Sequence, residues 1–167
     1  LHFGSYAMVV DPVASTQRAL VEREHGLRVI AYDPNVRLNV EPDLQRWRDT
    51  LDWMAARTHL LKVSDEDLAL LYPGVPHAEL AARWRAAGVA AVVVTRGGEG
   101  AVAWAANTEV SIAPVKVSVI DTVGAGDTFQ AAMLTALAER DLLSPDALRS
   151  VPAATWSEVL SFAARAA

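Results

Sequence analysis

The chain has 167 residues, 52% of them hydrophobic, with a formal net charge of −5. That length suits one domain rather than two, and the apolar content is ample for a buried core. The negative net charge argues against a general surface for binding nucleic acid or anionic membranes. The absence of cysteine excludes disulfides, thiolate metal sites and a cysteine nucleophile. No apolar run is long enough for a transmembrane helix.

Strand-like and helical stretches alternate from the start of the chain. The opening segment LHFGSYAMVV is strand-like, and apolar, β-branched runs predict further strands at Arg28–Asp33, His59–Val63 and Ala90–Thr95. Helices are expected between them, at Val13–His25, Asp43–Arg57, Asp65–Leu71 and His77–Ala87. Gly26 and Gly88 stand where helices should stop. The alternation predicts one α/β domain, residues 1–167, with a mostly parallel sheet and helices on both faces.

After Thr95 the pattern changes to a hairpin and a helix. A glycine-rich turn leads into AVAWAA, and Glu109–Ala113 is a second short strand, so a hairpin is expected at one sheet edge. A helix is expected close to Gly126. Its buried stripe recurs at helical spacing at Phe129, Ala132, Met133, Ala136 and Leu137.

Both ends of the sequence suggest a piece of a longer protein. The first residues are already strand-like and carry no starting methionine, and SFAARAA ends inside a helical pattern without a stop signal. We therefore expect a further portion of the sheet before Leu1, and an apolar sheet edge where that portion is missing.

Polar clusters follow three of the predicted strands. They are Asp33-Pro34-Asn35-Val36-Arg37, Lys62-Val63-Ser64-Asp65-Glu66-Asp67 and Thr95-Arg96-Gly97-Gly98-Glu99-Gly100. Ligands of open parallel sheets bind at the carboxyl ends of the strands, so these clusters mark a candidate site. Each cluster also has a purely structural interpretation, since Asp-Pro-Asn forms turns, Ser64 is a good N-cap and glycines form hairpins.

The segment Gly124-Ala125-Gly126-Asp127 places an acid in the first turn of the last predicted helix. The exposed N–H groups of a helix start suit a phosphate, and glycines let it approach the backbone. No lysine follows, which excludes a P-loop, and Phe129 stands where a dinucleotide fingerprint needs glycine. A carboxylate beside an anion hole suits phosphoryl transfer, with Asp127 accepting the proton of an attacking hydroxyl. The alternative is that Asp127 only caps its helix.

These motifs together resemble a known family. The segment DTVGAGDTF, residues 121–129, resembles the C-terminal signature of the ribokinase-type (PfkB) sugar kinases. DPNVR resembles the family's DPN-x-R segment, LKVSDEDLALLYPG its central acidic segment, and TRGGEGA its nucleotide turn. Together with HFGS near the start, the combination is closest to the fructokinase branch. The resemblance covers the whole chain, which would be about the C-terminal half to three-fifths of such a kinase.

The resemblance implies a ribokinase-like (Rossmann-like), doubly wound α/β fold that lacks its N-terminal part and lid. It implies that Asp127 is the catalytic base and that the backbone N–H groups of Gly124, Ala125, Gly126 and Asp127 form the anion hole. The resemblance also implies that Arg37 contacts the transferring phosphate and that Asp33 and Asn35 lie near the sugar or phosphate. The nucleotide would be bound by Thr95, Gly97, Gly100, Lys62 and Ser64. Asp67 would lie near Mg²⁺, through water, and Asp121 with the carbonyl of Val123 would bind a monovalent cation.

The implied activity is ATP-dependent phosphorylation of a sugar hydroxyl, of fructose or a related ketose, with ATP, Mg²⁺ and a K⁺ ion bound. A 2-keto-3-deoxysugar-acid or nucleoside kinase, or a non-catalytic nucleotide-binding relative, stays open. The family also implies a cytoplasmic protein and a homodimer formed through the missing lid, with no nucleic-acid or membrane partner. One departure matters: the family usually has Glu where Asp67 stands, with Asn or Ser three residues before it.

Overall fold

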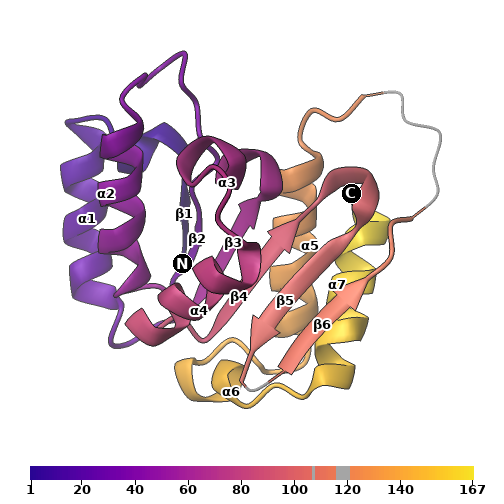
Figure 1. The fold of residues 1–167 in the computed structure, drawn as a ribbon. Coiled ribbons are helices and arrows are strands. Elements are labelled where there is room, and N and C mark those ends of the chain that lie inside the picture. Colours follow the sequence, from indigo (N-terminus) through magenta and orange to yellow (C-terminus); the bar gives the residue numbers. More distant parts are fainter. Residues whose placement is uncertain (107, 116–120) are drawn as a thin grey trace.

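The structure, a computed structural model, describes residues 1–106, 108–115 and 121–167. Within these residues one six-stranded sheet has the strand order β1-β2-β3-β4-β5-β6 (Figure 1). The strands are β1 (His2–Gly4), β2 (Ala31–Asp33), β3 (Leu60–Ser64), β4 (Ala91–Thr95), β5 (Ala101–Ala105) and β6 (Thr108–Ile112). β1 to β4 run parallel, and β5 and β6 are antiparallel additions. The predicted parallel sheet with a hairpin at one edge is confirmed.

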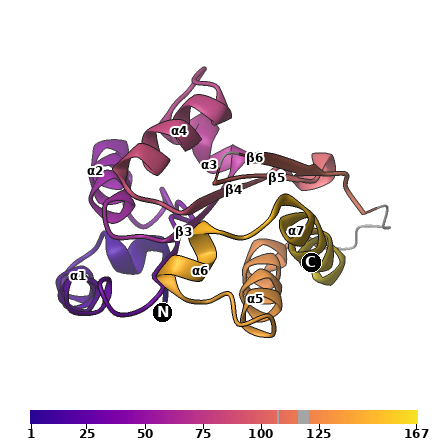
Figure 2. The same cartoon turned by 90° about the horizontal axis from the view of Figure 1, so that it is seen from below.

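Helices cover both faces of the sheet (Figure 2). They are α1 (Val13–Glu24), α2 (Leu44–Ala55), α3 (Asp65–Leu71), α4 (His77–Ala87), α5 (Ala125–Ala138), α6 (Pro145–Arg149) and α7 (Ala153–Ala166), with short 3-10 turns η1 (Ser5–Met8) and η2 (Gly97–Glu99). In Figure 2, α2, α3 and α4 lie on one side of the sheet and α5, α6 and α7 on the other. The predicted doubly wound architecture is therefore confirmed.

Two hydrophobic cores result from the alternation of side chains along the strands. Leu61 packs toward the helices of the first half of the chain, with Trp47 of α2 and Trp84 of α4. Its neighbour Leu60 faces the opposite way and packs with Met133 of α5. Because both faces are covered, β3 and β4 are almost continuously buried, which explains their unbroken apolar sequences. Lys62 shares the face of Leu60 and so points to the α5 side.

Several element boundaries differ from the sequence prediction by one to three residues. The strand expected at Arg28–Asp33 begins only at Ala31, because the Ile30 N–H donates to the His59 imidazole Nδ1 (3.1 Å) instead of to a strand. Gly88 ends α4 in the left-handed region, φ 125°, as predicted. α1 ends at Glu24, one residue before the predicted end, with His25 as its C-cap, so Gly26 directly follows the end of the helix as predicted.

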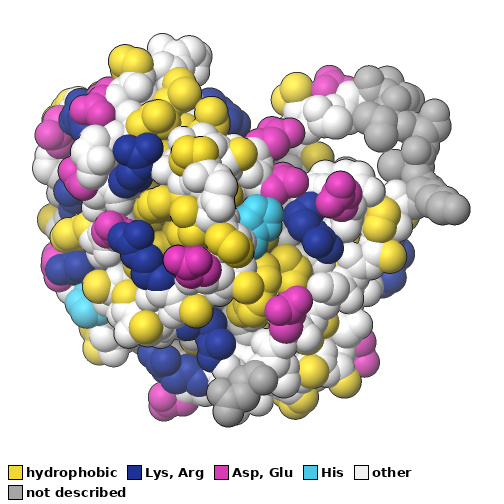
Figure 3. Space-filling view, viewed as in Figure 1, with side chains coloured by type: hydrophobic (Ala, Val, Ile, Leu, Met, Phe, Trp, Pro, Cys, Tyr) yellow, Lys and Arg dark blue, Asp and Glu magenta, His cyan; other side chains and the backbone are white. Residues whose placement is uncertain are grey.

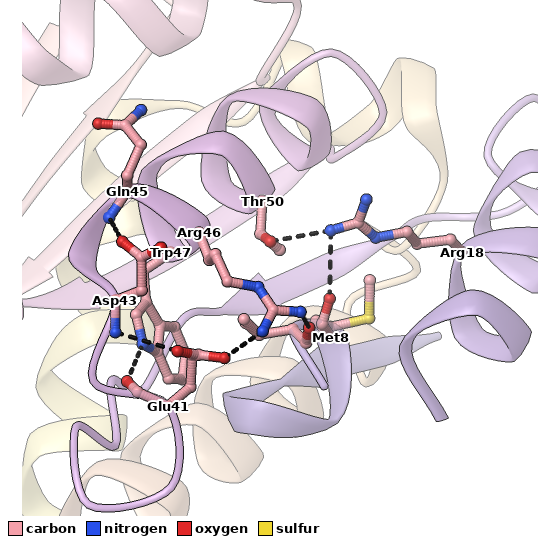
Figure 4. Close-up of polar contacts among 9 residues, drawn as sticks. Met8, Arg18, Glu41, Asp43, Gln45, Arg46, Trp47 and Thr50 are labelled. Atoms are coloured by element: carbon pink, nitrogen blue, oxygen red, sulfur yellow. Dashed lines mark hydrogen bonds and ion pairs between the residues drawn. The ribbon is translucent and has the colours of Figure 1, made fainter. Parts of the chain in front are cut away.

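Two arginines, one on α1 and one on α2, form hydrogen bonds to backbone carbonyls at the end of η1 (Figure 4). Arg18 donates to the Met8 carbonyl (3.5 Å) and to Thr50 Oγ1 (2.9 Å), and Arg46 donates to the Val9 carbonyl (3.1 Å) and pairs with Glu41. The carbonyls at the end of η1 are thereby satisfied. These contacts fix the segment that follows β1.

Charges of both signs are interspersed on the face that carries α2 and α4 (Figure 3). Arg83 of α4 pairs with Asp52 of α2 at 2.7 Å, for example. In the described part of the chain, no helix combines the length and the apolar character that crossing a membrane requires.

Candidate active site

The carboxyl ends of the parallel strands bring the predicted clusters together. Gly4, Asp33, Ser64 and Thr95 are the last residues of β1 to β4. The strand register pairs Gly4 with Asp33 and Ser64 with Thr95. The three polar clusters predicted from sequence therefore lie along one edge of the sheet.

Lys62 and Asp33 form a buried ion pair at this edge. Lys62 Nζ donates to Asp33 Oδ2 at 2.7 Å, and each side chain is 5% exposed. A buried charge is tolerated only when it is paired, so each of these groups depends on the other. A Cβ atom added to Gly126 would lie 3.1 Å from Lys62 Nζ. The ion pair thus lies directly against the start of α5, where the lysine charge adds to the positive end of the helix dipole.

The start of α5 is shaped by Gly124. This residue is the N-cap of α5 and has φ 80°, a left-handed conformation that suits glycine. The N–H of Ala125 donates to the Thr122 carbonyl at 3.1 Å. Within the described residues, the N–H groups of Gly124, Gly126 and Asp127 have no hydrogen-bonded backbone acceptor. These three therefore remain candidates for binding an anion, whereas the Ala125 N–H is already engaged.

Asp127 is solvent-exposed in this first turn, and its carboxylate makes no hydrogen bond to a described side chain or backbone group. It does not cap its own helix through a side-chain hydrogen bond, since Gly124 is the N-cap. The carboxylate is therefore accessible to a substrate hydroxyl. Residues 116–120, which precede this turn, lie outside the described part of the chain.

The segment that is predicted to bind a monovalent cation, Asp121 to Val123, forms a small turn. Asp121 Oδ1 accepts the Val123 N–H at 2.9 Å, and the Val123 side chain is 89% exposed. One oxygen of Asp121 is thus engaged locally. Its other oxygen and the Val123 carbonyl remain the predicted ligands.

The loop after β2 is held in an unusual conformation. Asn35 has φ 41°, in the left-handed region, and its N–H donates to Asp33 Oδ1 at 3.2 Å. Its carbonyl accepts from Ser5 Oγ at 3.2 Å, and Ser5 is itself left-handed with φ 58°. Non-glycine residues of this kind cost free energy, and they cluster at functional sites. Arg37, the predicted phosphate contact, is exposed and donates to the Val36 carbonyl at 3.0 Å.

Asp67 is buried in the first turn of α3. Its own N–H donates to Ser64 Oγ (3.0 Å), and its Oδ1 accepts the Val36 N–H (3.2 Å). Burial, followed by the nearby Asp33 carboxylate, raises the pKa of Asp67 to about 6. Ser64 is therefore the N-cap of α3, the structural role that its sequence also allowed.

The acids at this edge do not fit a magnesium site built on Asp67. Mg²⁺ that accompanies nucleotide phosphates keeps several waters and takes one or two carboxylates. Asp67 is 8% exposed and already accepts a backbone N–H, while Asp33 is held by Lys62. In the described ranges no three His, Cys, Asp or Glu side chains gather closely enough to hold a metal ion.

The glycine turn after β4 contains two glycines of different character. Gly97 has φ 47°, and a Cβ atom there would meet open space. Gly100 has φ 86°, and a Cβ atom there would lie 2.1 Å from the Ile112 carbonyl oxygen of β6. The hairpin therefore requires Gly100 whether or not a nucleotide binds. Gly97, like Gly98, has open space beside it, and Thr95 is half-buried near this turn.

The structure adds two residues that the sequence did not single out. Ser5, from the quoted HFGS motif, fixes the Asn35 carbonyl. His2 is the first residue of β1, two residues before Gly4 at the edge of the site. The pKa of His2 is lowered, chiefly by partial burial of the ring, and the carboxylates of Asp33 and Asp127 oppose that shift. The side-chain type of Ser5 was visible in the sequence, but its partner 30 residues away was not.

A separate hollow of about 320 Å³ lies between α1 and α2. Its lining includes Asp11, Arg18, Arg46 and Asp49. None of these belongs to the predicted site. The two arginines are occupied by the carbonyls of η1.

Comparison with known sequences gives a consistent family match. Residues 1–167 match the pfkB family of carbohydrate kinases. The chain is 40% identical over 144 residues to a fructokinase of Rhizobium leguminosarum bv. trifolii, covering 86% of this chain and 44% of that protein. It is 32% identical over 153 residues to a fructokinase of Klebsiella pneumoniae, covering 90% and 49% respectively. The chain thus spans about half the length of these relatives.

Solved structures agree on the fold. The fructokinase of Vibrio cholerae O395, determined with fructose, ADP and calcium ion, superposes with a TM-score of 0.80 at 25% identity, over 98% of this chain and 51% of that one. Aminoimidazole riboside kinase of Salmonella enterica superposes with a TM-score of 0.81 at 22% identity, over 98% and 53%. The ribokinase-like fold predicted from sequence is confirmed.

Proposed function

Because the chain belongs to the pfkB family of carbohydrate kinases, we propose that the protein containing it transfers the γ-phosphoryl group of ATP to a hydroxyl of fructose or a related ketose. The fructokinase relatives support the substrate class, and the Vibrio cholerae enzyme, described with fructose and ADP, supports the nucleotide. Residues 1–167 would be the nucleotide-binding and catalytic portion of a single domain.

The observation that carries this proposal is the start of α5. An accessible carboxylate, Asp127, stands in the same helical turn as the N–H groups of Gly126 and Asp127, with the Lys62 ammonium against Gly126. A proton acceptor and an anion-binding terminus are therefore adjacent. That is the combination that phosphoryl transfer to an alcohol requires.

The reaction follows from these parts. The sugar hydroxyl oxygen forms a bond to the γ-phosphorus, its proton passes to the Asp127 carboxylate, and the bond to the β-phosphate oxygen breaks with ADP leaving. Negative charge on the transferring phosphoryl group faces the N–H groups at the start of α5. Arg37, whose guanidinium is exposed on the neighbouring loop, is the proposed second contact to this group.

The nucleotide is proposed to lie along the β4 end, with Thr95 and Gly97 beside its phosphates. Gly100 shapes that turn. Lys62 and Ser64 are proposed to support the nucleotide site, Lys62 as the ion-pair partner of Asp33 and Ser64 as the N-cap of α3. Asn35 and Asp33 would border the sugar. A K⁺ ion is proposed at Asp121 and the Val123 carbonyl, since a double mutant of the Vibrio cholerae fructokinase is described with a potassium ion. Mg²⁺, bound to the nucleotide, would neutralise phosphate charge.

An ADP-release assay on the complete protein tests the proposal. The panel should contain fructose, another ketose, a 2-keto-3-deoxysugar acid and a nucleoside, each with ATP. We expect kcat/KM to be highest for fructose or the second ketose. Preference for the sugar acid or the nucleoside would move the protein to another branch of the family. ATP binding without turnover of any acceptor would identify a non-catalytic relative.

A further inference from the structure

Asp67 connects two elements of the site that are far apart in sequence. It lies in the first turn of α3, after β3, whereas the N–H group that it accepts belongs to Val36, in the loop after β2. Both residues are buried, at 8% and 6% exposure. The hydrogen bond of 3.2 Å is therefore shielded from water, and no solvent molecule can readily replace Asp67 as the acceptor.

Val36 stands between two residues of the proposed site. On one side is Asn35, whose left-handed backbone is already held by Asp33 and Ser5. On the other side is Arg37, whose guanidinium donates to the Val36 carbonyl. The Val36 N–H is the third fixed point of this loop. A left-handed non-glycine residue persists only when its surroundings over-determine it, so each of these contacts matters.

We propose that Asp67 is a positioning residue that holds the Asn35–Arg37 loop through the Val36 N–H, and that it does not hold Mg²⁺. This inference rests on the phosphotransferase function proposed above. The family's usual Glu has one more methylene group, and the shorter Asp directs its Oδ1 to the loop. Its burial also leaves little room for the water shell that Mg²⁺ keeps.

A role in positioning the loop and a role in binding Mg²⁺ require different properties of the Asp67 side chain. A hydrogen-bond acceptor for Val36 needs an oxygen but no charge, so an amide can replace the carboxylate. A magnesium contact, even through water, depends on the negative charge. Asp67→Asn therefore separates the roles, and Asp67→Ala removes both. Asp65→Asn is the matched control, because Asp65 lies in the same helical turn and, among the residues that the structure describes, its carboxylate accepts a hydrogen bond only from the adjacent Glu66 N–H.

The variants should be compared in the complete protein by two measurements. The first is amide hydrogen exchange at Val36, without nucleotide or metal. The second is the Mg²⁺ concentration that gives half-maximal ADP release, together with kcat and the KM for the sugar. Asp67→Asn should keep Val36 protection and the Mg²⁺ requirement within about threefold of wild type. Asp67→Ala should lose about tenfold or more in Val36 protection, which corresponds to one hydrogen bond of about 1.4 kcal/mol, and kcat should fall with it.

A tenfold rise in the Mg²⁺ requirement of Asp67→Asn, with Val36 protection unchanged and Asp65→Asn normal, would overturn the proposal. So would unchanged Val36 protection in Asp67→Ala. If Asp67→Ala does not fold, Asp67→Asn alone decides between the roles. If the wild-type protein phosphorylates no acceptor, the proposed function fails, but the exchange measurement still tests the Asp67–Val36 contact by itself.

Discussion

At the scale of single residues, the charged groups at the carboxyl edge of the sheet are of two kinds: some are buried and bonded to a specific partner, and others are exposed to solvent. Asp33, Lys62 and Asp67 are buried, and each has a specific partner. Asp127 is exposed, and within the described residues its carboxylate forms no hydrogen bond or ion pair. A buried, partnered group is suited to fixing geometry, whereas an exposed carboxylate at a helix start is available to react.

Replacing Asp127 by Asn tests its role as a base. Asn keeps the shape and the helix terminus but removes the proton acceptor. General-base loss costs on the order of 10² to 10⁴ in rate, so we expect kcat to fall by that factor while ATP affinity, measured by calorimetry, stays near wild type. Asp146→Asn is the matched control, since Asp146 is an exposed acid in the first turn of α6. Wild-type turnover in Asp127→Asn would exclude Asp127 as the base, because Asn and Asp cap helices about equally well.

The pKa of Asp67 predicts a pH dependence of stability. Its pKa is raised from 3.8 to about 6 in the folded protein, chiefly by burial. Well below pH 3.8 the carboxyl group is protonated in both states, and the folded state carries no penalty. As pH rises from 3.8 to about 6, the unfolded state ionises before the folded state does, so the folded state loses relative stability, and the loss levels off above the folded pKa. Asp67→Asn removes this penalty, and its unfolding free energy should exceed that of wild type by up to about 3 kcal/mol at pH 7 and by little at pH 4.

Urea unfolding of both proteins at pH 4 and pH 7, in the presence of a metal chelator, measures this difference. An unfolding free-energy difference that is independent of pH would show that Asp67 titrates normally. The chelator matters because a bound divalent ion would itself favour the ionised carboxylate.

At the scale of elements, the turn between β4 and β5 contains one glycine in close contact with the backbone and one beside open space. Gly97 and Gly100 are both left-handed, but only Gly100 is in close contact, with the Ile112 carbonyl. The hairpin geometry thus accounts for Gly100 and leaves Gly97 to be explained by a ligand or by its backbone conformation alone.

Gly97→Ala distinguishes these possibilities. The added methyl group meets open space in the free protein, so the cost to stability should be about 1 kcal/mol, from the left-handed backbone. If the turn lines the nucleotide, the methyl group occupies space the phosphates need, and we expect ATP affinity to fall at least tenfold by calorimetry.

Two neighbouring glycines serve as controls for that measurement. Gly98→Ala, where φ is ordinary and the space is open, should leave ATP affinity and stability nearly unchanged. Gly100→Ala should disrupt the hairpin, because its Cβ would collide with backbone. Equal ATP affinity in Gly97→Ala and Gly98→Ala would indicate that the turn only forms the hairpin.

At the scale of the whole molecule, the described sheet has two edge strands, β1 and β6, and β1 is the one that lies next to the candidate site. In the described residues β1 pairs with β2 alone, and the chain spans about half the length of its fructokinase relatives. Leu1, just before β1, and Tyr6, in η1 just after it, are each 49% exposed. An open strand edge of this kind is a template for association with another chain.

Residues 1–167 expressed alone should therefore associate or aggregate as concentration rises, whereas the complete protein should not do so through this edge. Size-exclusion chromatography with light scattering, over a range of concentrations, measures the difference. A monomeric fragment with protected β1 amides would show that the edge needs no further strand.

The sequence by itself determined the fold class and most of the site's parts. Strand length, β-branched runs and helical spacing are local properties, so α3 and α4 were predicted to the residue, and the hairpin and the start of α5 nearly so. The strand expected at Arg28–Asp33 was too long because the Ile30 N–H is taken by a histidine side chain, a partner 29 residues away. The motifs around Gly124 and Asp127 were readable because backbone conformation and helix ends need particular residue types at fixed spacing.

Only the tertiary structure decided what each polar side chain touches. The family resemblance predicted Lys62 at the nucleotide and Asp67 near a metal ion, and both stay predictions. The fold adds that Lys62 pairs with Asp33 and that Asp67 accepts the Val36 N–H. These partners are 29 and 31 residues apart, and the parallel register of the strands together with the short reach of each side chain selects them. Residue type limits the bonds a group can form, and long-range packing chooses among them.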